Sequence, residues 1–292
     1  MNLSRVTQTS IGATTLRGLQ GNLSSLQKLQ EQLSSGKRVQ QPSDDPSATA
    51  TAMLLSSQKA ADDQYGRNIG AATNRLQVAD SALQDLSSQL QSVRNLLVES
   101  RNGSLTPEGK AGLSAQISAI RDETVNLYNT RYLDRPVFGG TVAGPYAVDP
   151  TTQAYVGDDQ PITTRVSHDS VVRVDVKGSD VGADSVPGLL STVVTSVTSA
   201  SGASSADLDA IDAELSKVSK ALSDVGARQN RVDDAKNLVE DHASSLTARI
   251  SENVDIDLPA TIMHLQMQQV AYQSALGASA KILQKSLVDY LG

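Results

Sequence analysis

The chain has 292 residues, a formal net charge of −7 at pH 7 and no cysteine. Its length allows one or two domains of ordinary size. The acidic balance argues against a nucleic-acid partner, which needs a basic face, and the lack of cysteine excludes disulfides, thiolate zinc sites and a cysteine nucleophile. With one Phe, seven Tyr and no Trp, the chain is expected to draw its stability from long aliphatic contacts, as coiled coils do.

The first predicted element is a helix that ends at Gly36, in an N-terminal core segment of residues 1–40. Its leucines keep two interlocked seven-residue registers, which is the pattern of a coiled-coil seam. Gly36 suits the left-handed position after a helix end, and two prolines soon after it prevent the helix from continuing. The leucines of this seam are Leu16, Leu19, Leu23, Leu26 and Leu33.

Residues 41–135 are predicted to form an arm of two helices. The first begins near Pro46, where Asp44 and Asp45 suit the positive end of the helix dipole. Two heptad registers run along it, through Ile69, Leu76, Leu83, Leu90 and Leu97 and through Ala72, Ala79, Leu86 and Val93. Thr106 and Pro107 then begin a third helix, which is expected to fold back antiparallel on the second.

Residues 136–204 are expected to form a small β-rich insertion. Gly-Gly, Gly-Pro and Asp-Pro pairs mark turns in it, and the segments 162–166 and 171–176 alternate like half-buried strands.

Helical spacing resumes in a C-terminal arm, residues 205–254, which is predicted to pair with residues 41–135. One heptad register is unbroken, whereas Gln229 and Lys236 interrupt the other, and a buried polar position of this kind can set helix alignment. The unbroken register is Ile211, Val218, Val225, Val232, Val239 and Leu246. A final core helix, within residues 255–292, presents Ile262, Leu265, Tyr272, Leu276, Leu283 and Leu287.

The predicted fold class is therefore mainly α: a long antiparallel coiled coil or helical bundle built from the two terminal arms, with a small inserted β-rich domain. The first and last helices are each other's natural partners. A pair of helices buries its leucines only partly, while ordering the backbone costs about 1 to 2 kcal/mol per residue. We therefore expect both ends to be mobile in the dilute monomer and to gain their remaining burial from other subunits.

No arrangement of residues predicts an enzyme, a metal site or a bound cofactor. His168, His242 and His264 lie on separate predicted elements, without the spacing of a zinc site. His168, Asp169 and Ser170 are the residue types of a catalytic triad, but neighbours on a strand point to opposite faces, so a surface turn is favoured. The sequence also lacks a signal-peptide core and the roughly 20 consecutive apolar residues of a membrane span.

Several segments resemble the flagellin-like family. Residues 33–46 (LSSGKRVQQPSDDP) are similar to its N-terminal motif, and the two prolines are closer to hook-associated members than to filament flagellin. Residues 129–141 resemble the family's exit from the third helix, residues 226–231 (GARQNR) its C-terminal motif, and residues 283–291 the end of its hook-associated junction proteins. The motif residues are Leu33, Ser34, Ser35, Gly36, Asp44, Asp45, Gln229, Asn230 and Arg231.

The resemblance implies a structural component of the bacterial flagellum, a hook-filament junction adaptor that forms a ring with copies of itself. It implies a neighbouring hook-associated junction protein and flagellin as further partners, and an export chaperone on the C-terminal helix. It further implies export to the cell exterior by the flagellar type III route without a cleaved signal peptide. Two alternatives stay open, filament flagellin and an unrelated coiled-coil secretion adaptor.

Overall fold

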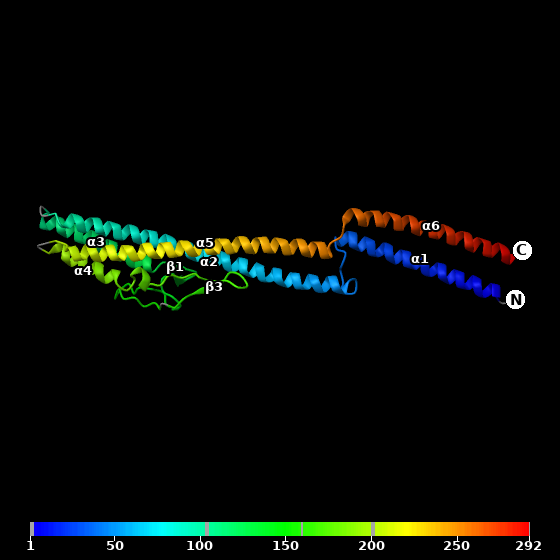
Figure 1. The fold of residues 1–292 in the computed structure, drawn as a ribbon, viewed down its shortest axis with the longest axis horizontal. Helices are drawn as coiled ribbons and strands as arrows, with labels where there is room; N and C mark the ends of the chain where they lie inside the picture. The colour runs from blue at the N-terminus through cyan, green and yellow to red at the C-terminus, as the bar shows by residue number, and fades with distance from the viewer. Residues whose placement is uncertain (1–2, 103–104, 159, 200–201, 292) are drawn as a thin grey trace. The chain divides into compact units, whose positions relative to one another are not determined.

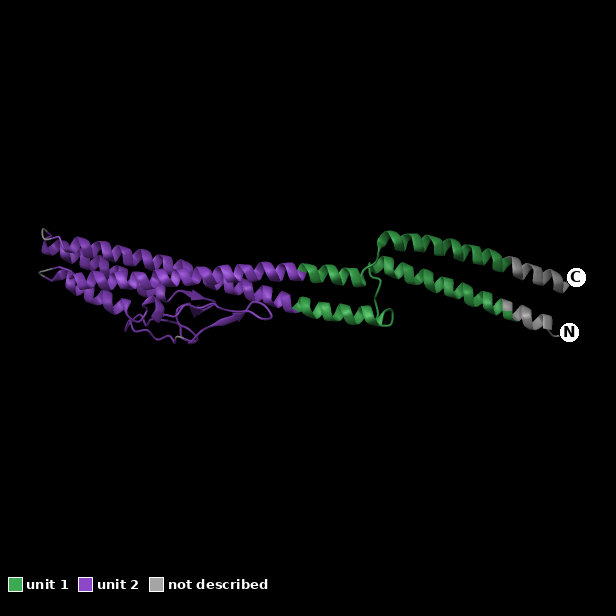
Figure 2. Cartoon of the chain, viewed as in Figure 1, with its two compact units in different colours: residues 1–60, 244–292 green, residues 61–243 purple. Residues whose placement is uncertain are grey.

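The computed structural model describes residues 3–102, 105–158, 160–199 and 202–291, with side chains other than those of residues 3–9, 11 and 281–291. The chain divides into two compact units (Figure 2), one of residues 1–60 and 244–292 and the other of residues 61–243. Long helices predominate over two small two-stranded sheets, so the predicted mainly α fold class is confirmed.

The first unit contains the two ends of the chain. Helix α1 (Leu3–Ser35) and helix α6 (Leu258–Leu291) lie side by side and run in opposite directions (Figure 1). Both helices end or begin where the sequence predicts. Gly36 follows α1 with a φ of 70°, and the Asp257 carboxylate accepts a hydrogen bond of 3.0 Å from the backbone N–H of Ala260 in the first turn of α6.

The second unit is built around the C-terminal part of helix α2 (Pro46–Ser100), from residue 61, and the N-terminal part of helix α5 (Ser205–Val254), up to residue 243. The remaining part of each helix belongs to the first unit. Both predicted heptad registers of α2 are buried throughout, with Leu76, Leu83 and Leu90 at 0% exposure. The unbroken register of α5 is buried as well, while Leu208, Leu215 and Leu222 of its other register are half-buried.

One detail of the α5 prediction is wrong. Lys236 is not a buried polar position, because its side chain is 56% exposed and its ammonium group lies 3.9 Å from the carboxylate of Glu240, one turn along the helix. A long lysine on an exposed helix face reaches water easily, so it does not set the alignment of a buried seam.

Helix α3 (Pro107–Tyr128) begins as predicted, with the Thr106 hydroxyl accepting a hydrogen bond of 3.1 Å from the backbone N–H of Gly109. Its buried residues Leu113 and Ile117 join the core that α2 and α5 form. The core is continued by residues of the insertion, including Phe138, whose ring meets that of Tyr128 edge to face at 6.1 Å between centroids.

The insertion contains two short antiparallel hairpins. Strands β1 (Arg131–Tyr132) and β2 (Arg135–Pro136) pair with each other, as do β3 (Thr163–Arg165) and β4 (Val171–Arg173). The strand segments expected near residues 162–166 and 171–176 are thus present in shorter form.

The rest of the insertion departs from the β-rich expectation, because a short 3-10 helix η1 (Ser179–Val181) and helix α4 (Val186–Thr198) follow. The sequence of α4 is rich in Val, Thr and Ser, which are weak helix formers. Val186, Leu190, Val193 and Val197 are nevertheless all fully buried. Burial of one helical face against the core therefore overrides the local preference.

Candidate assembly surface

The α1 and α6 pair buries little of the predicted leucine seam. In α1, Leu26 is buried at 8% exposure, Leu19 and Leu33 are half-buried, and Leu16 and Leu23 remain 57% and 44% exposed. Helix α6 therefore covers only part of the leucine seam of α1.

The same holds for α6. Leu265 and Tyr272 are half-buried, while Ile262 and Leu276 remain 40% and 44% exposed. The predicted positions Leu283 and Leu287 lie outside the described side chains. Both helices of the pair thus keep apolar side chains in contact with water.

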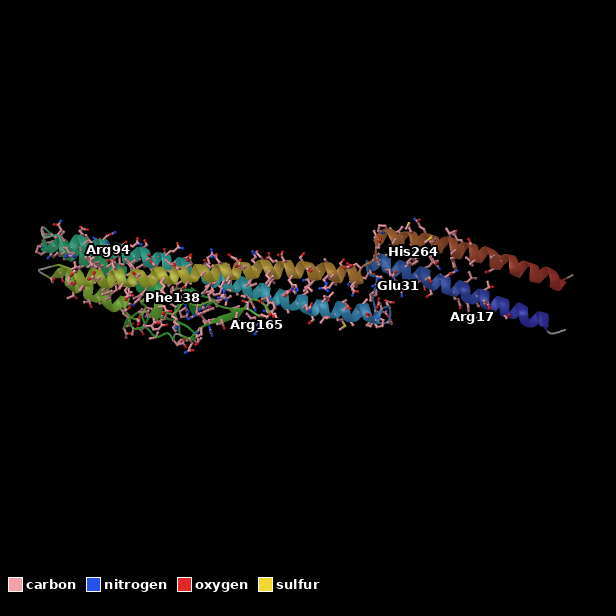
Figure 3. The ribbon with its side chains drawn as sticks, in the orientation of Figure 1. Arg17, Glu31, Arg94, Phe138, Arg165 and His264 are labelled. Atoms are coloured by element: carbon pink, nitrogen blue, oxygen red, sulfur yellow. The ribbon has the colours of Figure 1, made fainter. Side chains whose placement is uncertain are left out.

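The structure adds three apolar residues that the heptad search missed. Met263, Met267 and Val270 follow one another by four and three positions, so they share one face of α6, and each is at least 60% exposed. Polar residues of the same pair, such as Arg17, Glu31 and His264, are drawn in Figure 3. A helix that is apolar on more than one side usually has more than one neighbour. The apolar residues of α6 outside its heptad positions are therefore the signal in the sequence that could have predicted this second apolar face.

The segment after α1 is fixed against the segment before α6. The carbonyl of Gly36 accepts a hydrogen bond of 3.1 Å from the N–H of Ile256, and the carbonyl of Val254 accepts one of 2.7 Å from the N–H of Arg38. The Arg38 guanidinium also donates to the carbonyl of Asn253 at 2.8 Å. These bonds join residues 36–38 to residues 253–256, which are far apart in the sequence, and fix the connection between the helix pair and the rest of the first unit.

The motif residues Asp44 and Asp45 organise this connection. Asp44 binds the Lys28 ammonium at 2.9 Å and accepts from the N–H groups of Gln40 and Gln41, and the bond from Lys28 holds the pKa of Asp44 below its usual range. Asp45 caps α2 by accepting from the N–H of Ala48 at 2.9 Å. That bond is the main reason why the pKa of Asp45 is also lowered.

The remaining motif residues are Ser34, which is exposed, its neighbour Ser35, and three residues of α5. Ser35 bonds within the connection, where its hydroxyl accepts from the Gln40 side chain at 2.7 Å. Asn230 and Arg231 are exposed on α5, Gln229 is half-buried, and none of the three forms a side-chain hydrogen bond with another residue in the described part of the chain. These three side chains are therefore open to new contacts.

The surface turn expected at His168 and Asp169 is confirmed. The Nδ1 atom of His168 lies 2.6 Å from a carboxylate oxygen of Asp169, so the two neighbours do touch. They belong to the turn between β3 and β4 rather than to a strand, and both side chains are almost fully exposed. His242 pairs with Asp62 at 2.6 Å.

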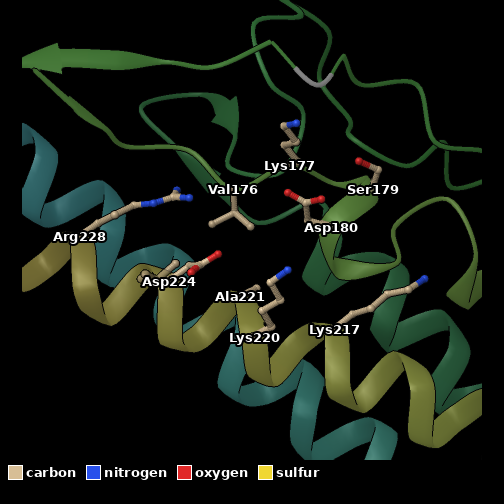
Figure 4. A pocket seen from close by; sticks show the side chains of 10 residues that line it. Val176, Lys177, Ser179, Asp180, Lys217, Lys220, Ala221, Asp224 and Arg228 are labelled. Carbon is tan, nitrogen blue, oxygen red and sulfur yellow. The ribbon is translucent and has the colours of Figure 1, made fainter.

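A cavity of the second unit has a volume of about 240 Å³ and a lining of mixed charge (Figure 4). Lysines and one arginine line it together with two carboxylates. Two of its cations are already bound, Lys217 by Glu214 at 2.9 Å and Arg228 by the carbonyl of Asp175 at 2.6 Å. Its charged residues are Lys177, Lys217, Lys220, Arg228, Asp180 and Asp224.

The residues that the structure describes were also compared with the geometry of metal sites and of membrane spans, and they match neither. No group of three or more His, Asp or Glu side chains there has a geometry that could hold a metal ion. No described helix is both long and apolar enough to cross a membrane.

Comparison with known proteins identifies the family. The model of the bacterial flagellin N-terminal helical region matches residues 6–140, and that of the bacterial flagellin C-terminal helical region matches residues 208–291. The two models together span most of the chain, and the chain belongs to the flagellin family. It is thus a structural protein of the bacterial flagellum, and the family prediction is confirmed.

The individual relatives sharpen this result. The chain is 28% identical to flagellar hook-associated protein 3 of Escherichia coli (strain K12), over 90% of this chain and 92% of the relative. It is 26% identical to flagellar hook-associated protein 3 of Salmonella typhimurium (strain LT2), over 89% and 91%. The crystal structure of FlgL from Xanthomonas campestris shares the fold, with a TM-score of 0.61 at 17% identity, over 66% of this chain and 98% of that one.

Proposed function

We propose that this chain is the adaptor at the hook-filament junction, where it assembles as a ring of identical subunits between hook and filament. Support comes from relatives called flagellar hook-associated protein 3 that align with about nine tenths of the chain. The two prolines in residues 33–46 also favour this branch of the family over filament flagellin.

The observation that carries the mechanism is the exposed apolar surface of the terminal helix pair. Full burial of a large apolar side chain from water stabilises by about 1.5 to 3 kcal/mol, and each of these partly exposed side chains would gain roughly half of that on assembly. In the ring, the α1 and α6 pair of one subunit packs against the pairs of its neighbours and forms the inner core. The residues that drive assembly are Leu16, Leu19, Leu23, Ile262, Met263, Met267, Val270 and Leu276.

The same surface explains the other proposed partners. A neighbouring hook-associated junction protein and flagellin, with terminal helices of the same type, continue the core on either side of the ring. An export chaperone covers the apolar faces of α6 before assembly, since exposed patches of this kind favour aggregation. The chain leaves the cell by the flagellar type III route without a cleaved signal peptide and acts outside it.

A strain that lacks this chain tests the proposal by electron microscopy. The expected phenotype is hooks without filaments, together with flagellin shed into the medium. Hooks without filaments and without shed flagellin would instead identify the chain as the filament subunit. Normal filaments would contradict both functions.

Purified protein separates the alternatives further. A junction protein binds hook tips and then stops, whereas filament flagellin polymerises into long helices when it is seeded. Deletion of residues 258–292 is expected to abolish hook binding, because α1 loses its partner. Hook binding that survives this deletion would favour the unrelated secretion adaptor.

A further inference from the structure

The hairpin of β1 and β2 has an unusual turn. Leu133 and Asp134 join the two strands, with φ angles of 47° and 61°. A two-residue hairpin loop with positive φ at both positions is a type I′ turn, which strongly favours Asn or Gly. A leucine in this conformation is strained, because its Cβ atom crowds the following carbonyl oxygen.

The side chain of Leu133 is also hardly buried, so packing within the chain does not explain a leucine at this position. It is 78% exposed, the highest value among the exposed large apolar residues of the described chain. Single exposed leucines are ordinary, but backbone strain and exposure at one residue together indicate a role outside the isolated fold. The exposed charged residues around Leu133 are Arg131, Asp134 and Arg135, which carry a net positive charge.

The base of the hairpin is held firmly. Asn129 accepts hydrogen bonds from the N–H groups of Ala147 and Val148 at 2.8 and 2.9 Å, and its amide donates to the carbonyl of Val148 at 2.7 Å. The N–H of Val137 donates to the carbonyl of Thr130 at 2.8 Å. Leu133 is therefore presented on a fixed support, which lowers the entropic cost of docking it.

A groove of complementary character lies on α2 and α3 in the same unit. It has a volume of about 520 Å³. Val78 and Leu127 are half-buried apolar residues at its floor, next to the buried Ala82. Its rim is polar and includes the exposed carboxylate of Asp85.

We propose that Leu133 of one copy docks in the groove over Val78 and Leu127 of the next copy. The pairing matches an apolar side chain on a turn of net positive charge, with two arginines and one aspartate, to an apolar floor beside the carboxylate of Asp85. It rests on the proposed ring, in which identical chains lie next to one another. It adds a specific contact between the outer parts of neighbouring subunits to the packing of the terminal helices.

Because the chain has no cysteine, single-cysteine variants can test the contact cleanly. Leu133→Cys and Ser81→Cys, the latter on the exposed rim of the groove, are produced together and allowed to assemble on hooks. Mild oxidation is expected to link the two variants, since a disulfide requires Cα atoms within about 7 Å. Leu238→Cys, 64% exposed on α5, replaces Leu133→Cys in the control and is expected to give no linked dimer.

The same samples separate the two hypotheses. A ring that forms on the hooks without a disulfide above the control level would overturn the docking contact and leave the proposed function standing. Absence of the ring itself would overturn both.

Leu133→Asn provides a second, independent measurement. Asparagine accepts the positive φ, so the Tm of the free protein is expected to rise by about 2 to 4 °C. The same change removes the docking side chain, so fewer hooks should keep their filaments under shear. A stabilised monomer with unchanged filament retention would refute the contact.

Discussion

Asn22 and Gln268 join the two ends of the chain, although 246 positions separate them in the sequence. The side-chain amide of Gln268 donates a hydrogen bond of 3.2 Å to the amide oxygen of Asn22, and both residues are half-buried between α1 and α6. A polar pair in an apolar seam fixes how two helices are aligned. This contact therefore sets the register of the surface that we propose for assembly.

Two leucine substitutions should separate pairing from assembly. Leu26→Ala removes a buried side chain from the marginal pair of α1 and α6, so the remaining helix content of residues 12–35 in the free chain is expected to fall further. Leu16→Ala changes an exposed residue, so the free chain should keep its stability within about 0.5 kcal/mol while ring formation weakens. Circular dichroism and amide exchange of the free chain, with hook binding in parallel, check both. Equal effects of the two variants in the free chain would contradict the pairing.

The ends of the chain should change their dynamics on assembly. In a dilute monomer, amide protons of residues 12–35 and 258–280 are expected to exchange rapidly. The burial within a lone helix pair scarcely offsets the conformational entropy lost when the two helices become ordered. In assembled junctions the same amides should be strongly protected. Hydrogen exchange read by mass spectrometry makes the comparison, and the core of α2 around Leu83 serves as the internal reference. Fast exchange at the ends of assembled protein would exclude their burial in a core.

Acid should loosen the connection between α1 and α2. Folding lowers the pKa of Asp44, because the ammonium of Lys28 and two backbone N–H groups bind the charged carboxylate. A lowered pKa means that this contribution is complete above the unfolded value of about 3.9 and is lost as the pH falls through the folded value. The protection of the Gln40 and Gln41 amides, measured relative to their intrinsic exchange rates at each pH, should therefore fall below about pH 4. In Asp44→Asn these amides should exchange faster already at pH 7 and respond much less to acid.

Much of the fold can be predicted from the sequence because most helices here follow one strong pattern. Leu76, Leu83 and Leu90 repeat every seven residues, and all three are fully buried. Thr106 and Pro107 mark the start of α3, and Gly36 marks the end of α1, because each of these residues has a particular backbone role at a helix terminus.

Other features arise from tertiary contacts that leave little trace in local sequence. Helix α4 has the composition of a strand, and its buried valines become a helical face only when the core is present to cover them. The turn at Leu133 lacks the Asn-Gly signal that would mark a type I′ hairpin. Met263 and Val270 were missed in the candidate surface because they stand outside the heptad that α6 shares with α1, and their exposure depends on which neighbours the helix has.

Arg75 offers a test of stability in the second unit. Its side chain is buried at 8% exposure, and its Nε and Nη2 atoms have no hydrogen-bond partner in the described protein. The nearby carboxylate of Asp175 is already bound by Arg173, through bonds of 2.9 and 2.6 Å. Burial accordingly lowers the pKa of Arg75, which shows that the charged form is disfavoured there.

Replacing this charge by an apolar side chain of similar length should therefore stabilise the protein. Arg75→Met is expected to raise the thermal midpoint by a few degrees, since an uncompensated buried charge is removed without loss of a hydrogen bond. Arg173→Met is the matched control, and it should destabilise by about 3 kcal/mol because it leaves Asp175 buried without its ion-pair partner. Thermal and guanidinium unfolding of the two variants measure both effects. If Arg75→Met destabilised the chain as much as Arg173→Met, Arg75 would have to share in the binding of Asp175.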